Sequence, residues 1–266
     1  MFFHKEIEQG NFGNVSFANG SVRFQSVKLN VYCYIIDGIA IDAGSQSLKN
    51  EFQSFFINKE IDALYCTHIH EDHTGCAAWL QQKNIPVYIH EKSIVEASKK
   101  GKYPMYRQFF WGKRRAFKAN PIPETFTSRT YNWQSIFTPG HSSDHMVFLN
   151  TSTGQLFSGD LFVQIRTKVI MDSESIPQII NSIEEVLKYD FDEVFCNHAG
   201  YIKDGKQKFK EKLGYLYQIT DRVQQLHKQG KTITEIHQQV FPRKYPITMF
   251  SSGQWDSKHI VTSILE

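Results

Sequence analysis

Residues 68–73 of this 266-residue chain read HIHEDH and place three histidines and two carboxylates within six positions. Imidazole nitrogens and carboxylate oxygens are the usual protein ligands of zinc and similar first-row metals. The cluster follows a short apolar run at 63–66, which is typical of a buried strand. Alternate residues such as His68 and His70 can point the same way, while Asp72 and His73 curl round to a neighbouring position. The spacing predicts a metal site that could serve two ions.

Three more candidate ligands each follow a short apolar run later in the chain. They are His141, Asp160 and His198. Polar residues at the ends of buried strands lie where α/β proteins place their functional sites. One such residue alone is more often a surface or capping group. The three are candidate ligands because they occur together with the histidine cluster.

The elements that must position these residues alternate between strands and helices. Predicted strands span 21–27, 31–36, 39–41, 63–66, 87–89, 135–137, 146–149, 155–157 and 193–196. Asp37-Gly38 predicts a two-residue hairpin turn. Predicted helices span 48–58, 74–82 and 176–187, followed by a basic helix that ends at Gly230 and a capped helix start at 232–235. This order is typical of a layered α/β protein.

Taken together, the motifs resemble those of the metallo-β-lactamase-fold hydrolases, in the branch with a full two-metal site. The family signature T-H-x-H-x-D-H-x-G stands at 67–75 as THIHEDHTG. The family's T-P-G-H element stands at 138–141, its S/T-G-D element at 158–160 and its D-x-G turn at 42–44. The last histidine of the family matches His198. All five elements occur in family order.

The resemblance implies a four-layer αββα metallo-β-lactamase sandwich, in which two sheets face each other and the metals lie at one edge. It implies that one metal is held by His68, His70 and His141, that the other is held by Asp72, His73 and His198, and that Asp160 bridges both. An anionic bridge offsets the repulsion between two ions about 3.5–4 Å apart. The expected cofactors are two divalent metal ions, with zinc favoured and manganese or iron as alternatives.

The implied reaction is that of a dinuclear metallohydrolase, in which a hydroxide bridging the two metals attacks an ester-type substrate. Asp72 is expected to be catalytic, because one oxygen can bind a metal while the other orients the hydroxide or moves a proton. We expect Asn197 to orient the neighbouring His198 through hydrogen bonds. Two positions depart from the family pattern. The last histidine of the family often follows Pro-Gly, whereas His198 follows Asn197, and Asp144 stands where glycine is common. His145 matches a frequent supporting histidine and is not assigned to a metal.

The substrate stays open at this point. A thioester or lactone is favoured, because the pattern is similar to that of glyoxalase II and lactonase-type hydrolases. A phosphodiesterase or ribonuclease of the same fold is the alternative, and a mononuclear-iron persulfide dioxygenase or a non-catalytic binding protein is less favoured. The family's β-lactamases generally lack the aspartate found here at Asp160, and its flavodiiron oxidoreductases have glutamate where His70 stands.

Residues 92–130 lie between the first two ligand elements and carry 10 basic but only two acidic groups. They include the run YPMYRQFFWGKRR at 103–115. Such a segment could be a lid, a surface that binds nucleic acid by charge and stacking, or a scaffold whose aromatic side joins the core. We favour the lid over the nucleic-acid surface. The expected partner is a small-molecule substrate, for which an anion is one alternative. Nucleic acid is not favoured, and no membrane partner is expected.

Composition places the chain among ordinary globular proteins, with 41% hydrophobic and 21% charged residues. We predict one domain over 1–266, with an inserted helical segment at 92–130 and a helical C-terminal extension at 201–266. No apolar run approaches the ~20 residues of a membrane span, and charges near Met1 interrupt any signal-like stretch, so we expect a cytoplasmic protein. The four scattered cysteines are expected to be buried thiols. The oligomeric state is not indicated.

Overall fold

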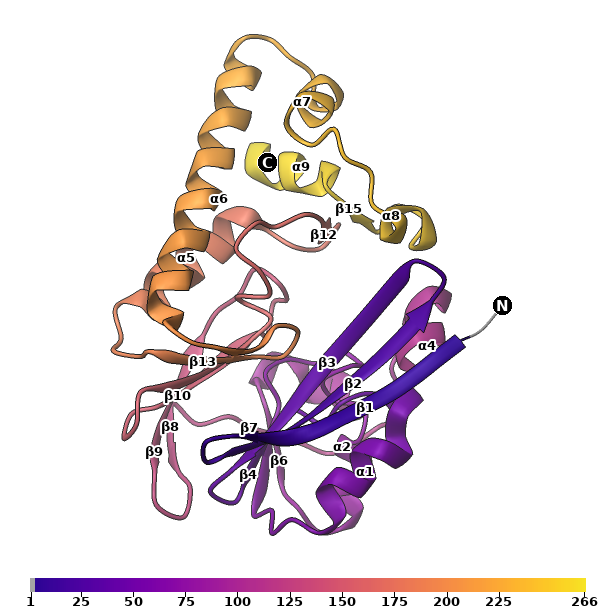
Figure 1. Ribbon diagram of the computed structural model, residues 1–266, viewed down its shortest axis with the longest axis vertical. Coiled ribbons are helices and arrows are strands. Elements are labelled where there is room, and N and C mark those ends of the chain that lie inside the picture. The colour runs from indigo at the N-terminus through magenta and orange to yellow at the C-terminus, as the bar shows by residue number, and fades with distance from the viewer. Residues whose placement is uncertain (1–2) are drawn as a thin grey trace.

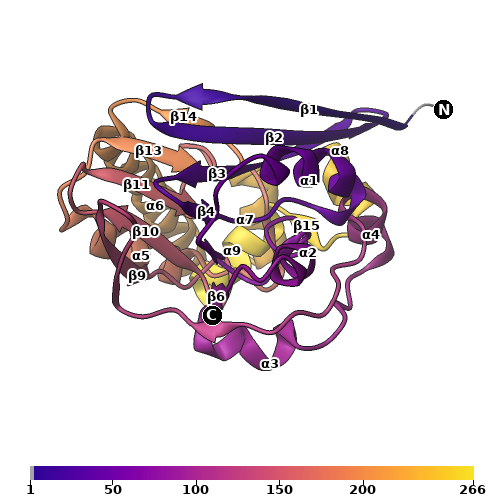
Figure 2. The ribbon, with the colours of Figure 1, turned by 90° about the horizontal axis from the view of Figure 1, so that it is seen from below.

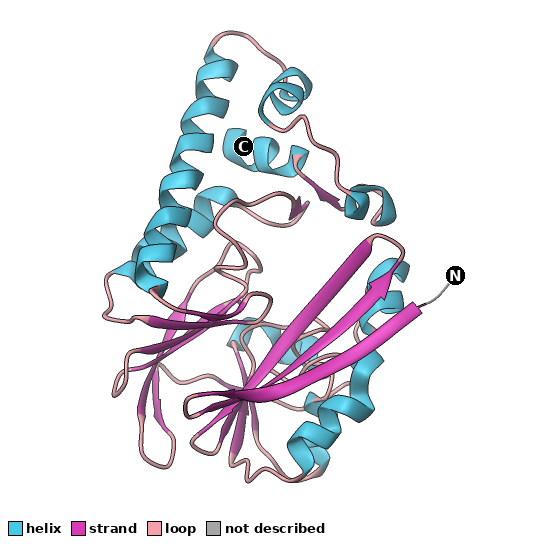
Figure 3. Ribbon diagram, in the orientation of Figure 1, coloured by secondary structure: helices cyan, strands magenta, loops and turns pink. Residues whose placement is uncertain are grey.

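The computed structural model describes residues 3–266, and two large sheets dominate this part of the chain (Figure 1, Figure 3). In spatial order, the first sheet contains β1 (Phe3–Phe12), β2 (Val15–Phe24), β3 (Val27–Ile36), β4 (Ile39–Ile41), β5 (Ala63–Tyr65), β6 (Val87–Ile89) and β7 (Asn120–Pro121). The second contains β14 (Gly200–Ile202), β13 (Glu193–Cys196), β11 (Gln155–Gly159), β10 (Met146–Asn150), β9 (Asn132–Phe137) and β8 (Thr125–Thr127). A small pair joins β12 (Ile170–Met171) to β15 (Trp255–Asp256).

The first sheet begins with antiparallel hairpins and continues with parallel strands from β4 to β7. The hairpin turn at Asp37-Gly38 is confirmed, and both residues have positive φ, at 49° and 83°. The predicted strand at 21–27 is wrong, because the chain turns at Gln25, whose φ is 53°, between β2 and β3. Polar and apolar residues alternate across this turn without a break, so the sequence pattern does not reveal the turn.

Three groups of buried side chains define four layers of structure. Along β3, Cys33 and Ile35 pack toward α1 (Lys49–Ile57) and α2 (Ala77–Gln82), whereas Tyr34 and Ile36 face the second sheet. The Tyr34 hydroxyl donates a hydrogen bond across to the carbonyl of Cys196 at 2.7 Å. Figure 2 shows the two sheets facing each other with helices outside them. The αββα sandwich is confirmed.

The second sheet is covered by α5 (Ile176–Leu187) and α6 (Gly205–Lys228). Helix α5 has the predicted bounds, and the hydroxyl of Ser175 caps it by accepting from the Gln178 N–H. This capping is typical of serine, which satisfies a free N–H of the first turn. Helix α6 is followed by Gly230, whose φ is 81°, as the sequence predicts.

The segment 92–130 contains the short helices α3 (Ile94–Ala97) and α4 (Met105–Trp111), and its later part contributes β7 to one sheet and β8 to the other. Its core is built around Arg114, which is 1% exposed and donates hydrogen bonds to backbone carbonyls that include those of Ala97 and Lys99. The division of the chain into domain, insertion and extension stays a prediction.

After α6, the chain forms α7 (Ile233–Val240), α8 (Pro246–Phe250) and α9 (Lys258–Leu265) (Figure 1). The predicted cap of α7 is confirmed, since Thr232 and Glu235 bond each other's backbone N–H groups. Within residues 3–266, no helix combines the length and apolar character needed to cross a bilayer. All four cysteines are buried and free, as expected.

Candidate metal centre

The seven predicted ligand residues come from four segments, each of which follows a strand. The segment after β5 carries four of them, and the segments after β9, β11 and β13 carry one each. The structure brings all seven together in three overlapping groups, within each of which the donor atoms lie within 4.8 Å of one another. The groups are His68, His70 and His141; His68, His73 and Asp160; and Asp72, His73 and His198. Their assignment as ligands stays a prediction.

Three imidazole nitrogens converge in the first group. His68 Nε2 lies 2.8 Å from His70 Nδ1, which in turn lies 3.1 Å from His141 Nε2. Burial lowers the pKa of His68 and of His70 well below the usual range, so both rings are neutral. A neutral imidazole offers a lone pair, which is the form that binds a metal.

The second group combines Asp72 with two histidines. The Asp72 Oδ2 lies 3.7 Å from His198 Nε2 and 3.9 Å from His73 Nε2. Two imidazoles and one carboxylate are a common ligand set for zinc. The resemblance implies this division into two sets, and the geometry is compatible with it.

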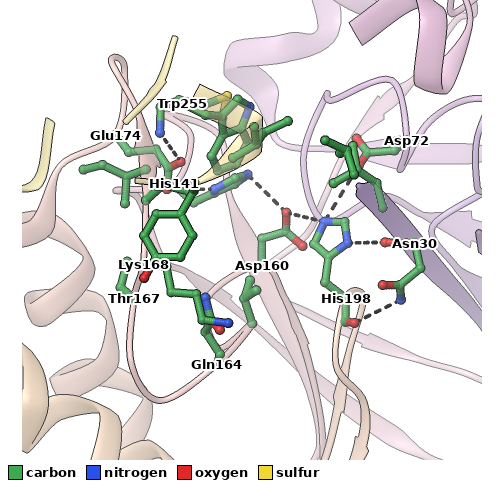
Figure 4. A pocket seen from close by; sticks show the side chains of 18 of the residues that line it. Asn30, Asp72, His141, Asp160, Gln164, Thr167, Lys168, Glu174, His198 and Trp255 are labelled. Carbon is green, nitrogen blue, oxygen red and sulfur yellow. Dashed lines mark hydrogen bonds and ion pairs between the residues drawn. The ribbon is translucent and has the colours of Figure 1, made fainter. Parts of the chain in front are cut away.

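Asp160 lies between the two sets. Its Oδ2 is 3.2 Å from His141 Nε2, 3.1 Å from His198 Nε2 and 3.4 Å from His73 Nε2 (Figure 4). Burial would raise the pKa of Asp160, but these histidines outweigh it and hold that pKa well below the usual range. The ionised carboxylate therefore lies close to histidines of both sets, and its role as a bridging ligand stays a prediction.

Asp42 fixes the orientation of His73. Its Oδ2 lies 2.8 Å from His73 Nδ1, which leaves Nε2 facing the other donors. The carboxylate also accepts the N–H and the hydroxyl hydrogen of Thr67, both at 2.7 Å. Asn197 donates to the same Oδ2 at 2.8 Å. We expected Asn197 to orient His198, but its side-chain amide acts on Asp42 and thus on His73.

His141 and His198 are oriented in the same manner. His141 Nδ1 lies 3.1 Å from Glu174 Oε2, and His198 Nδ1 lies 2.5 Å from the backbone carbonyl of Asn30. An acceptor at Nδ1 holds the hydrogen there and directs Nε2 into the site. Sequence reasoning missed Glu174, because an acid two residues before a predicted helix is typical of a capping region.

Two buried atoms of the seven converging residues have no hydrogen-bond partner among residues 3–266. They are His73 Nε2 and Asp160 Oδ1. Buried polar atoms are rarely left unpaired, and each unpaired atom costs about 1–3 kcal/mol. Both atoms are good metal donors, so the residues present fit divalent metal ions.

His145 supports Asp160 from behind. Its Nε2 accepts the backbone N–H of Asp160 at 3.0 Å, so its Nδ1 carries the hydrogen and donates to the Thr138 hydroxyl at 2.8 Å. Burial lowers the pKa of His145 to about 3, which keeps the ring neutral in this role. Gly159 leaves room for the contact, because a Cβ there would lie 2.5 Å from His145 Nε2.

Two buried carboxylates tie the first ligand loop to the segment 92–130. Asp144 accepts the Ile69 N–H at 2.9 Å and the Ser93 hydroxyl at 2.7 Å. Glu71, which lies between two predicted ligands, accepts two hydrogen bonds from Arg107 of α4, at 2.6 and 2.7 Å. Sequence reasoning did not identify the Glu71–Arg107 pair, although an acid inside the ligand motif is a signal for a buried partner.

A cavity of about 660 Å³ opens onto the site. Its polar wall includes Asp72, His141, Asp160 and His198 (Figure 4). Its apolar wall comes from α4, the segment 161–171 and the segment 245–255, with side chains such as Phe110, Trp111, Leu161, Met171, Ile247 and Trp255. A volume of this size suits a small molecule.

Comparisons with known proteins point to one family. The chain is 31% identical over 102 residues to "Probable metallo-hydrolase YybB" of Bacillus subtilis, covering 38% of this chain and 46% of that protein. It is 29% identical over 135 residues to "Probable polyketide biosynthesis zinc-dependent hydrolase BaeB" of Bacillus velezensis, covering 48% of this chain and 54% of that protein. The matches thus span about half the length of each relative.

The fold is similar to that of a beta-lactamase domain protein from Burkholderia ambifaria, with a TM-score of 0.71 and 17% identity. That likeness covers 97% of this chain and 87% of the other. The sequence profile described as "Metallo-beta-lactamase superfamily" matches residues 27–198, which include all seven converging residues. The chain therefore belongs to the metallo-beta-lactamase superfamily.

Proposed function

We propose that this protein is a metal-dependent hydrolase that cleaves a small thioester or lactone. The observation that carries the proposal is the convergence of five histidines and two aspartates at one end of a cavity. The names of the two Bacillus relatives, a metallo-hydrolase and a zinc-dependent hydrolase, support the same class of reaction.

In this proposal, His68, His70 and His141 hold one divalent ion, and Asp72, His73 and His198 hold the other. Asp160 spans the two, because its Oδ2 lies near histidines of both sets. When bound, such ions supply Lewis acidity and lower the pKa of water toward neutrality.

The protein's own side chains orient the attacking water and the histidines, and one of them receives a proton. Asp72 lines the cavity, and we assign it to orienting the attacking water and receiving its proton. Asp42, Glu174 and the Asn30 carbonyl each hold the Nδ1 of one histidine, so the inner nitrogens stay fixed through the reaction.

The side chains of 92–130 favour a small substrate over a nucleic-acid strand. Phe110, Trp111 and Phe117 are buried, so these rings do not present faces on which bases could stack. Arg107 is bound to Glu71, and Arg114 is enclosed by backbone carbonyls. These three rings and two arginines are therefore engaged inside the protein, while the other basic side chains of the segment are exposed.

The test is hydrolysis by the metal-loaded protein of a thioester, a lactone and a phosphodiester, each with a chelator-treated control. The proposal expects chelator-sensitive turnover of the thioester or the lactone. Turnover of the phosphodiester alone would contradict it.

A further inference from the structure

Lys212 is a buried cation in the wall of the cavity. It lies in α6 between Phe209 and Leu216, both fully buried, on the face that packs onto the second sheet. The residue is only 5% exposed, yet it lines the cavity together with Asp160 and Leu161. Lysine is rarely buried on an apolar helix face unless its charge has a partner.

The protein satisfies only part of the Lys212 ammonium group. Nζ donates one hydrogen bond to the Phe162 carbonyl at 2.5 Å and lies 5.9 Å from the centre of the Phe162 ring, and among residues 3–266 it makes no ion pair and no second hydrogen bond. An ammonium has three N–H donors, so two remain unused. Burial lowers the pKa of Lys212 to about 8, which leaves the cationic form dominant at pH 7.

Two other cations of the cavity wall already have acidic partners. Arg107 is paired with Glu71, and Lys28 is paired with Glu6. The acids of the site are held among the histidines, as with Glu174 on His141. No carboxylate of the described chain lies within ion-pair distance of Lys212, and the cavity gives an anion access to it.

We propose that Lys212 is the recognition site for a negatively charged group on the substrate, such as a carboxylate. This inference rests on the proposed function and narrows its substrate class to thioesters or lactones that carry an anionic group beside an apolar portion. The apolar portion fits the wall formed by Phe110, Trp111 and Trp255. Lys168 also lines the cavity without an ion pair, but it is exposed, so it is a weaker anchor for charge (Figure 4).

The test compares charged and neutral substrates with the metal-loaded, full-length protein. One arm uses glutaryl and hexanoyl thioesters of N-acetylcysteamine, which place the charge on the acyl side. The other uses hexanoyl thioesters of 3-mercaptopropionate and of N-acetylcysteamine, which place it on the leaving group. We expect the wild type to prefer the charged member of one arm by at least about tenfold in kcat/KM, and Lys212→Gln to bring that ratio near one.

Lys206→Gln is the matched control. Lys206 lies on the same helix and also donates to a backbone carbonyl, that of Tyr189 at 2.6 Å, but it does not line the cavity. Lys206→Gln should keep the wild-type preference, and Lys212→Gln should turn over the neutral substrates within about threefold of wild type. An unchanged charged-to-neutral ratio in Lys212→Gln would overturn the proposal and leave Lys212 as a packing contact of Phe162.

A binding measurement separates this inference from the proposed function. Calorimetry with glutarate and with the neutral glutaramide, on wild type and Lys212→Gln, needs no turnover. Loss of glutarate binding in Lys212→Gln alone supports the anion site even if no thioester or lactone is cleaved. Equal glutarate binding by both proteins contradicts it, whatever the turnover.

Discussion

The guanidinium of Arg107 donates two hydrogen bonds, at 2.6 and 2.7 Å, to the fully buried carboxylate of Glu71. Glu71 stands in sequence between His70 and Asp72, one from each proposed metal set. A bidentate pair of this kind fixes the geometry of both partners. The segment 92–130 is therefore joined to the ligand loop from which both sets draw.

Removing the guanidinium should weaken metal binding. In Arg107→Met, Glu71 is left as an unpaired buried carboxylate, and the loop between His70 and Asp72 must rearrange to relieve it. We expect metal affinity to fall by about 10- to 100-fold, measured by competition with a chromophoric chelator.

Arg129→Met is the control, because Arg129 forms a comparable pair with Asp62 on the surface, with 43% of its side chain exposed. Its metal affinity should match that of the wild type. Equal affinity in Arg107→Met and wild type would show that the buried pair stabilises the fold without positioning the ligands.

Asp160→Ala should lose metal as well as activity. Asp160 Oδ2 is the atom that lies near histidines of both proposed sets, so its removal takes away the anion between two cations. We expect the metal content by mass spectrometry to fall from two ions per chain to one or fewer. Asp172→Ala, at an exposed position that does not line the cavity, should retain both. Two tightly bound ions in Asp160→Ala would disprove the bridging role.

Asp42→Ala should affect folding and metal binding together. It removes the acceptor of His73 Nδ1 and of Asn197 Nδ2, and it leaves the Thr67 N–H unpaired in a buried site. Each buried donor left without a partner costs about 1–3 kcal/mol, so urea unfolding of the metal-free protein should show a loss of at least that size. A variant as stable as the wild type, with unchanged metal affinity, would contradict the orienting role of Asp42.

Gly159→Ala tests the contact between His145 and Asp160. A Cβ at Gly159 would lie 2.5 Å from His145 Nε2, whereas a Cβ at Gly154 has its nearest neighbour at 3.8 Å. Both glycines have positive φ, at 50° and 75°, so each alanine costs about 1–2 kcal/mol from backbone conformation. Thermal unfolding should show a clearly larger loss for Gly159→Ala than for Gly154→Ala. An equal loss of thermal stability in the two variants would mean that His145 moves aside without destabilising the protein.

The sequence predicts which residues converge, because their types and spacing are local features. The motif at 67–75 and the histidines and aspartate at strand ends are visible as residue types at fixed spacing. The groups that orient them are less visible, since the contacts of Glu174 with His141 and of Arg107 with Glu71 join positions 33 and 36 residues apart. Such pairs depend on how the layers pack.

The same distinction applies to the fold. The helix at 176–187 is predicted with its correct bounds, because a serine cap and an apolar face define it locally. The turn at Gln25 is missed because apolar and polar residues alternate on both sides of it, and β1 is missed because most of its residues are exposed or partly exposed. Within 92–130, the burial of Arg114 and Trp111 depends on tertiary contacts, which cannot be predicted from the composition of the segment.

The most direct test of the account is chelator-sensitive hydrolysis by the protein loaded with two equivalents of zinc. Matched thioester, lactone and phosphodiester substrates are assayed together, with metal content measured on the same samples. We expect turnover of the thioester or the lactone, lost on chelation and restored by zinc. Turnover of the phosphodiester alone, or of none of the three with two metals bound, would contradict it.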